Sequence, residues 1–366
     1  MGGIRVLVLS ARIGEGHVTV AEQLAAQLRA RSDVQDVGLH TDLNVMGDRF
    51  GRFMTRSFEV HLDRVGWTYD LAYRAFFEQS LPRRCGHLAL AALGQRGLRR
   101  TIAAFRPDVV VTEYPLLSAA LGQLRSLGRL SVPVASTISD PAGLYYWAHP
   151  GIDLHLVAWP EAQAEVDRIA GPGRSAVVRP PIAPGFLGPA DATVARAELD
   201  LPPGVPVVLV SGGGWGMGDL IGAAEVARQL IPDGTVICLA GRNASVYTAL
   251  SERFAQDDRV LVLGFTDRMP ELLKVAAALI HTTGGTTALE ARATGCPLIN
   301  YGTGVAHVRA HARALQEWGI AEWAPDRDSL PPALRRALAG GRRPPGVATG
   351  LPGAAELIVG LAVSGV

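Results

Sequence analysis

The chain has 366 residues, of which 48% are apolar and 19% charged, and its formal net charge is +1. That length predicts two domains, and the apolar content allows a sizeable core. The near-neutral charge argues against nucleic acid as the main partner, because nucleic-acid binding normally requires a strongly basic face.

Cysteine usage and hydropathy point to a cytoplasmic protein. Cys85, Cys238 and Cys296 lie far apart, which fits a reducing compartment and predicts neither a disulfide framework nor a zinc site. The opening V-L-V-L-S is too short for the core of a signal peptide, and no apolar run reaches the ~18 residues that a membrane span needs. We expect a cytoplasmic protein, either soluble or peripheral on the inner face of the membrane.

The first expected strand, residues 6–10, ends in a glycine-rich turn where a helix begins. The turn reads G-E-G-H from Gly14 to His17. An imidazole at this point is a candidate for chemistry, and we expect it to be neutral near pH 7, because a helix N-terminus disfavours its protonated form. Thr19 and Glu22 also fit a capping box, in which case His17 is a spectator of the turn. The helix itself is predicted by an apolar stripe of Val20, Leu24 and Leu28.

The segment 44–100 differs from its surroundings. It mixes aromatic residues with arginine and contains ten arginines against five acids. Amphipathic basic helices of this kind suit a membrane surface or an apolar substrate. An ordinary helical insertion, whose aromatic residues are core, is the alternative.

Short β-branched runs alternate with helical patterns along the chain, which predicts parallel sheets built from βαβ units. Between residues 181 and 206 the chain is too rich in proline for a continuous element. We therefore expect a first domain over 1–180, a linker over 181–206, a second domain over 207–345, and a C-terminal loop and helix over 346–366. The candidate strands are 6–10, 109–112, 132–136, 154–157, 177–179, 207–211, 235–239, 260–263, 278–281 and 297–301.

Two further glycine turns follow strands of the second half, at 211–218 and 281–290. Helix N-termini expose unpaired amide N–H groups that bind phosphate, so two such turns predict a diphosphate site. Neither the turn that starts at Gly14 nor the stretch Gly212–Gly218 has the G-x-G-x-x-G spacing of a dinucleotide site, and no P-loop motif is present. Glu290 either completes a capping box with Thr287 or accepts hydrogen bonds from the two hydroxyls of a ribose.

An ordered series of motifs runs through most of the chain. It comprises L-S-A-x-I-G-x-G-H from Leu9, P-D-V-V-V-T from Pro107, T-I-S-D from Thr137, W-A-H-P-G-I-D from Trp147, G-G-G-W-G-M-G from Gly212, C-L-A-G-R-N from Cys238, L-G-F-T-D-R-M-P-E-L-L from Leu263 and T-G-G-T-T-A-L-E-A from Thr283. With these motifs the chain resembles the GT-B glycosyltransferases of the monogalactosyldiacylglycerol synthase and processive diacylglycerol glucosyltransferase group. That group is related to the bacterial N-acetylglucosaminyltransferase that completes lipid II.

The resemblance implies an α/β fold of the GT-B type, in which two Rossmann-like domains with parallel sheets face each other across a cleft. It implies an N-terminal domain for the acceptor, a C-terminal domain for a UDP-sugar, and His17 as the base at the mouth of the cleft, with Asp140 nearby. The acceptor site would include Gly16, Tyr145 and Trp147. The donor site would include Gly213, Gly214, Arg242, Asn243, Leu263, Gly264, Phe265, Thr283, Gly284, Gly285, Thr286, Thr287 and Glu290.

The activity implied is an inverting, metal-independent hexosyltransferase with no cofactor besides its UDP-sugar co-substrate. The acceptor would be a hydroxyl of a lipid or natural product, and the segment 44–100 would meet the lipid or membrane. His307 stands where the family carries a sugar-binding glutamine, with Val308 and Arg309 in place of acids, which leaves an unusual or charged sugar as an alternative. A UDP-sugar epimerase on the same fold and a non-catalytic binding protein are the rival functions.

Overall fold

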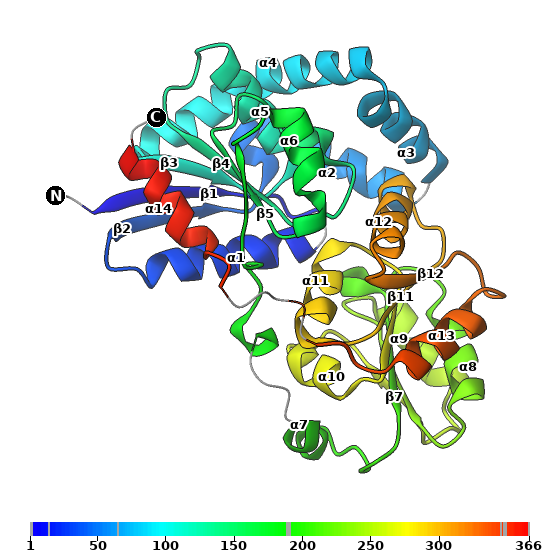
Figure 1. The fold of residues 1–366 in the computed structure, drawn as a ribbon. Coiled ribbons are helices and arrows are strands. Elements are labelled where there is room, and N and C mark those ends of the chain that lie inside the picture. Colours follow the sequence, from blue (N-terminus) through cyan, green and yellow to red (C-terminus); the bar gives the residue numbers. More distant parts are fainter. Residues whose placement is uncertain are drawn as a thin grey trace. The chain divides into compact units, whose positions relative to one another are not determined.

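The computed structural model describes residues 3–13, 15–63, 66–187, 192–344, 346 and 350–364. Gly14 of the first glycine turn, residues 188–191 of the expected linker and residues 345 and 347–349 lie outside the described residues. The chain forms two compact units (Figure 1). The first consists mainly of residues 1–182 together with the C-terminal helix, and the second mainly of residues 183–347.

The first unit is a six-stranded parallel sheet with helices on both faces. Its strands run in the order β2-β1-β3-β4-β5-β6. They are β1 (Ile4–Leu9), β2 (Val34–His40), β3 (Val109–Thr112), β4 (Val134–Ile138), β5 (Leu154–Val157) and β6 (Ser175–Val177). The helices are α1 (Glu15–Arg29), α2 (Asp48–Asp63), α3 (Gly66–Tyr73), α4 (Ser80–Phe105), α5 (Pro115–Ser126), α6 (Gln163–Ala170) and α14 (Ala354–Ser364). Short helical turns are η1 (Leu43–Met46), the π-helical η2 (Arg74–Glu78), η3 (Leu144–Tyr146) and η4 (Pro160–Ala162).

Strand β1 shows how the sheet is covered. Val6 and Val8 belong to the core with α1 and α14, whereas Leu7 and Leu9 belong to the core with α4 and α5. This follows from the alternation of side chains along a strand whose two faces are both buried. Figure 1 shows α14, the last helix of the chain, lying with this first sheet.

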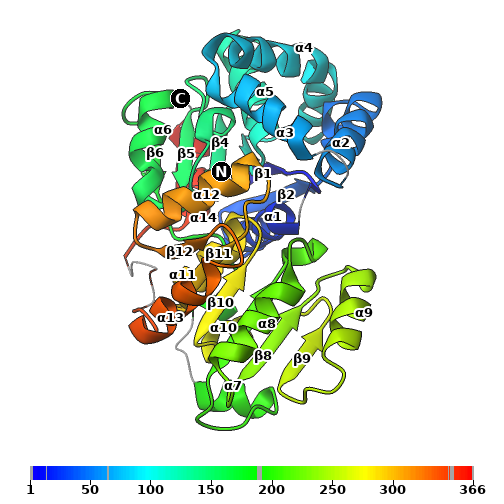
Figure 2. The ribbon, with the colours of Figure 1, turned by 90° about the vertical axis from the view of Figure 1, so that its right-hand side faces the viewer.

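The second unit is also a six-stranded parallel sheet, in the order β12-β11-β10-β7-β8-β9. Its strands are β7 (Val207–Ser211), β8 (Thr235–Leu239), β9 (Val260–Leu263), β10 (Ala278–His281), β11 (Leu298–Tyr301) and β12 (Ala321–Ala324). The helices are α7 (Ala192–Glu198), α8 (Leu220–Leu230), α9 (Ala244–Arg253), α10 (Met269–Val275), α11 (Gly285–Thr294), α12 (Ala306–Glu317) and α13 (Leu330–Gly340), with the turns η5 (Pro184–Phe186) and η6 (Gly213–Trp215). Figure 2 shows α8 and α9 beside β8 and β9.

The expected α/β class with two parallel sheets is confirmed, and each expected strand has a counterpart. Two strands are shifted by two residues from their expected positions. The strand expected at 132–136 is Val134–Ile138, and the strand expected at 177–179 is Ser175–Val177. The helix expected from Val20, Leu24 and Leu28 is α1, and those three side chains are fully buried. The strands β2 and β12 were not predicted. Both are edge strands, and in β2 only Val37 is buried.

Among the described residues, no helix combines the length and the apolar character needed to cross a membrane.

Candidate functional site

In the first unit, the candidate catalytic residues lie where the strand order reverses. Strand β1 pairs with β2 on one side and β3 on the other, so the loops after β1 and β3 leave the sheet at neighbouring carboxyl ends. Such a switch point is the usual ligand site of an open α/β sheet. His17, in the first turn of α1, follows β1, and Glu113 directly follows β3. Gly16 precedes His17 in the same helical turn.

His17 and Glu113 form a pair. Nδ1 of His17 lies 3.2 Å from Oε2 of Glu113. The glutamate side chain is fully buried, whereas the His17 side chain is 21% exposed. Ser139 donates from Oγ to Oε1 of Glu113 at 2.6 Å, and Ser10 donates from Oγ to the carbonyl oxygens of His17 and Glu113. The imidazole is therefore oriented from one side by a buried carboxylate.

Aromatic side chains surround the imidazole. The Tyr114 ring meets it edge-on with centroids 5.4 Å apart, and the Trp147 ring lies 5.6 Å away. Trp147 donates from Nε1 to Oδ2 of Asp140 at 2.9 Å. The structure thus brings three of the expected residues, His17, Asp140 and Trp147, into one cluster.

Two opposing effects set the protonation of His17. Burial disfavours the imidazolium, but the adjacent Glu113 carboxylate outweighs burial and raises the pKa of His17 to about 9. Burial raises the pKa of Glu113 to about 7, against the opposing influence of His17 and Ser139. Our expectation of a neutral His17 near pH 7 was wrong, because it considered the helix N-terminus and not a carboxylate from another strand.

Tyr145 is also held in place. The Arg83 guanidinium lies 3.7 Å from the centroid of its ring, and Arg168 donates from Nη1 to its hydroxyl at 3.0 Å. Tyr145 belongs to η3, which leads into Trp147, so its position is tied to the cluster through the backbone.

In the second unit, the two glycine turns lie side by side. Strand β10 pairs with β7, so that His281 aligns with Ser211 and the turns leave neighbouring carboxyl ends at the switch point of this sheet. A Cβ on Gly213 would come within 2.6 Å of Thr283 Oγ1, and Gly213 has a positive φ of 65°. Only glycine allows this close approach of the two turns. Gly214 accepts from the backbone N–H of Arg242 at 2.8 Å.

Helix α11 begins at Gly285, directly after the second of these turns. Its N-cap residue is Gly284, and no side chain caps it. Thr286 and Thr287 follow in the first helical turn, and Thr283 lies within 3.2 Å of His281 through Oγ1 and Nε2. The uncapped amides and the positive end of the helix dipole make this terminus suitable for a phosphate group.

Glu290 is the sixth residue of α11 and is 9% exposed. Because the N-cap is Gly284, Thr287 and Glu290 both lie inside the helix, and the capping-box interpretation is wrong. Within the described part of the chain, no hydrogen-bond donor is recorded for its carboxylate, and burial raises the pKa of Glu290 to about 8. A buried acid in this state calls for a polar partner, such as the hydroxyls of a ligand.

Two further loops of this unit carry expected site residues, with Arg242 and Asn243 after β8 and Phe265 after β9. Arg242 stacks on the Phe265 ring, 3.6 Å from its centroid, and Phe265 is 52% exposed. The Asn243 side chain accepts from the Val246 N–H and donates to the Trp215 carbonyl, so it fixes the loop after β8. Gly264 precedes Phe265 directly after β9.

His307 is the second residue of α12 and is half-buried. It follows β11, which is the neighbour of β10 in the sheet.

Residues 17–177 match the family model described as monogalactosyldiacylglycerol synthase. Residues 207–346 match the model of the glycosyltransferase family 28 C-terminal domain. The chain is a glycosyltransferase.

This glycosyltransferase is 25% identical over 328 residues to the processive diacylglycerol beta-glucosyltransferase of Bacillus subtilis, with 87% of this chain and 82% of the relative covered. Its fold matches that of MurG from Acinetobacter baumannii, with a TM-score of 0.59, 14% identity and 99% of each chain covered. It also matches a UDP-GlcNAc 2-epimerase from Neisseria meningitidis bound to UDP-GlcNAc, with a TM-score of 0.55, 13% identity and coverage of 99% and 100%. The expected GT-B fold is confirmed. The fold is common to transferases and epimerases, and the family models favour the transferase.

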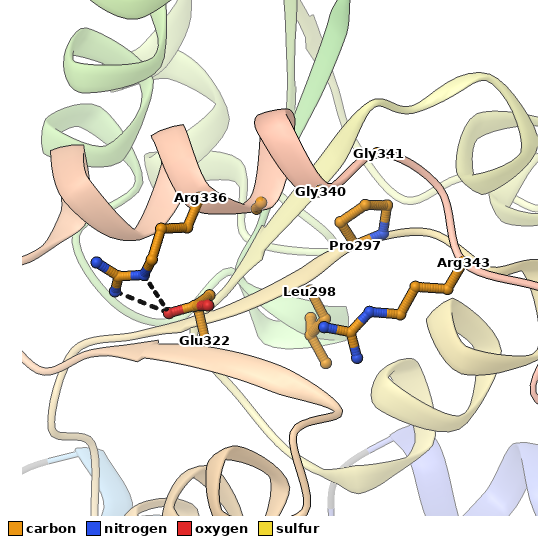
Figure 3. A pocket seen from close by; sticks show the side chains of 8 residues that line it. Pro297, Leu298, Glu322, Arg336, Gly340, Gly341 and Arg343 are labelled. Carbon is orange, nitrogen blue, oxygen red and sulfur yellow. Dashed lines mark hydrogen bonds and ion pairs between the residues drawn. The ribbon is translucent and has the colours of Figure 1, made fainter.

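A surface pocket of the glycosyltransferase lies away from the glycine turns (Figure 3). Pro297 and Leu298 are at the start of β11, and Glu322 is near the start of β12. In this pocket Arg336 pairs with Glu322 at 2.8 Å. The pocket is therefore at the amino ends of the strands, the edge opposite to the glycine turns, where open α/β sheets do not usually bind their ligands.

Glu113 is the residue of this site that the sequence analysis missed. A signal was present, because an acid directly follows the buried strand V-V-V-T. The carboxyl ends of parallel strands meet at one edge of a sheet, so an acid there can reach the residue after β1. The strand order needed for that inference is a tertiary property.

Proposed function

We propose that the protein is an inverting, metal-independent hexosyltransferase that moves a sugar from UDP to a hydroxyl of a diacylglycerol-type lipid or a related natural product. The observation that carries the proposal is the His17–Glu113 pair at the switch point of the first sheet. The region containing it matches a diacylglycerol-glycosylating family, and the Bacillus subtilis relative is named for diacylglycerol as its acceptor.

The second unit would bind the nucleotide. The amides of Gly284 and Gly285 and the hydroxyls of Thr286 and Thr287 would hold the diphosphate at the α11 N-terminus. Their fixed dipoles would offset the charge that develops on the leaving group, which is the basis for a metal-independent mechanism. Glu290 would accept hydrogen bonds from the ribose hydroxyls, since its buried carboxylate lacks a recorded donor among the described residues.

The first unit would supply the base. His17 in its neutral form would accept the proton of the acceptor hydroxyl at Nε2, the ring nitrogen that Glu113 does not engage. The acceptor oxygen would then bond to the anomeric carbon while the bond from that carbon to the phosphate oxygen breaks and UDP departs. A single displacement of this kind inverts the anomeric centre. Glu113 would stabilise the imidazolium that forms, as the acid of a catalytic triad does.

A lipid acceptor is supported by the α2–α4 region of the first unit. It exposes several large apolar side chains, namely Phe53, Leu71, Phe76, Leu81, Leu88 and Leu93. Arg49, Arg52 and Arg56 are exposed on α2 together with Phe53, at helical positions i, i+3, i+4 and i+7. One face of α2 therefore combines positive charge with an aromatic ring, which suits contact with the surface of an anionic membrane.

The test is transfer from UDP-glucose, UDP-galactose and UDP-N-acetylglucosamine to diacylglycerol in detergent micelles, followed by UDP release and lipid analysis. His17→Ala should lower turnover by ~10²–10⁴-fold, the usual contribution of a general base, while the affinity for UDP stays unchanged. Turnover of His17→Ala within a few-fold of wild type would remove His17 as the base. A new epimer formed without acceptor would favour the epimerase, and UDP binding with neither activity would favour a binding protein.

A further inference from the structure

Ser139 occupies a fixed position beside the proposed base. It directly follows β4 and is 1% exposed. Its carbonyl oxygen accepts from Nε1 of the fully buried Trp159 at 2.7 Å, and its hydroxyl donates to Oε1 of Glu113 at 2.6 Å. Because the backbone is tied to a buried indole, the hydroxyl has little freedom to turn away from the carboxylate.

The two oxygens of Glu113 are used by different partners. Oε2 faces Nδ1 of His17, and Oε1 receives the Ser139 hydroxyl. Rotation of the carboxylate would therefore break two hydrogen bonds at once. A fully buried carboxylate is costly unless it accepts hydrogen bonds, and without Ser139 its recorded side-chain partners among the described residues reduce to His17.

We propose that Ser139 is a positioning residue, which keeps the Glu113 carboxylate ionised and directed at Nδ1 of His17 and so sets the basicity of His17 Nε2. The inference rests on the proposed function of His17 as the base. Ser139 touches neither substrate nor the reacting atoms, and the transferred proton still goes from the acceptor hydroxyl to Nε2.

The proposal predicts the direction of a pH shift. The pair consists of Glu113 after β3 and His17 on α1. The other ionisable groups that face it are Tyr114 after β3 and Asp140 after β4. The competent state contains an ionised Glu113 and a neutral His17. Removal of the Ser139 hydroxyl makes ionisation of Glu113 harder. It also leaves His17 as the remaining side-chain partner of the ionised carboxylate, so the carboxylate stabilises the imidazolium more strongly and His17 loses its proton only at higher pH.

The experiment compares the pH dependence of kcat/KM in Ser139→Ala with that in the wild type. The acidic limb should move to higher pH by about one unit, and kcat/KM at pH 7 should fall about tenfold, as expected for the loss of one hydrogen bond to a charged group. Thr137→Val is the matched control, because Thr137 lies in β4 and its buried Oγ1 has no hydrogen-bond partner among the described residues. Its profile should coincide with the wild type.

A second pair of variants covers the case in which Ser139→Ala does not fold. Ser139→Thr keeps the hydroxyl and Ser139→Val replaces it with a methyl group of similar size, so only the valine variant should show the shift. Coincident profiles for these two variants, or for Ser139→Ala and Thr137→Val, would overturn the inference. Failure of the proposed function would look different, since His17→Ala would then keep its turnover or the wild type would transfer no sugar.

Discussion

Glu113 is the buried carboxylate that contacts His17, the proposed base. At neutral pH its carboxylate favours the imidazolium form of His17, whose pKa lies at about 9. Catalysis by a neutral His17 should therefore become faster as the pH rises toward that value.

The Glu113→Gln variant tests this dependence. Glutamine keeps the size of the side chain but removes the charge that favours the imidazolium, so the pKa of His17 should fall. The acidic limb of kcat/KM should move to lower pH, while the maximum rate falls because the imidazolium formed in the reaction loses its carboxylate. A pH profile of UDP release over pH 5–10 measures both effects. An unchanged limb would show that Glu113 does not control His17.

Glu290 is a buried acid for which no donor is found among the described residues, unlike Glu113. If it holds the ribose, Glu290→Gln should weaken UDP binding about tenfold, the value of about one lost hydrogen bond, because glutamine has one acceptor oxygen in place of two. Folding stability near pH 7 should change little, since burial raises the pKa of Glu290 to about 8 and its carboxyl group is then mostly uncharged in the free protein, as glutamine is. Calorimetry with UDP and thermal unfolding of the same preparation measure the two quantities. UDP affinity equal to that of wild type would exclude the ribose assignment.

At the level of elements, α2 carries the features expected of a membrane contact. Arg49, Arg52 and Arg56 are exposed on one face of this helix with Phe53 between them. The second unit also has exposed arginines, which allow a control variant with the same change in net charge.

Replacing Arg49, Arg52 and Arg56 by glutamine should reduce sedimentation with anionic vesicles. The free energy of vesicle binding should weaken by about 1 kcal/mol for each basic residue near the membrane surface, and this difference should become smaller in high salt. The control replaces the same number of exposed arginines on the second unit, Arg259, Arg327 and Arg335. Equal loss of binding in the two triple variants would assign the effect to net charge instead of α2.

For the molecule as a whole, buried histidines limit stability in acid. Burial lowers the pKa of His87 to about 4, of His149 to about 3, of His155 to about 4 and of His281 to about 4. In the unfolded chain these groups titrate near 6.5. Between pH 6.5 and about 4 the unfolded state therefore binds more protons than the folded state, and stability decreases as the pH is lowered.

Each of these histidines should lower the free energy of unfolding by up to about 1.4 kcal/mol for every pH unit below 6.5. Thermal unfolding at pH 7, 6 and 5 should show a steep decrease in melting temperature. His87→Leu removes one such group, and His87 Nε2 has no hydrogen-bond partner among the described residues, so this variant should show a shallower dependence. A melting temperature that is independent of pH between 7 and 5 would contradict the assignment of neutral buried histidines.

Local sequence patterns were sufficient to predict much of the secondary structure of this protein. The alternation of strands and helices, the glycine turns and the position of His17 could be predicted because each depends on residues close together in the chain. The edge strands β2 and β12 could not, since an edge strand packs less of its surface and carries a weaker apolar pattern, as Val37 alone in β2 illustrates.

Contacts between distant residues required the tertiary structure. His17 and Glu113 are 96 positions apart and meet because β1 pairs with β3. The position of Glu290 in its helix likewise required the structure, since an N-cap at Gly284 places the carboxylate inside α11 and not at its cap. Sequence alone determined the class of fold and the positions of the glycine turns. Strand order and burial decided which carboxylate contacts His17, because both arise only when the sheet is assembled.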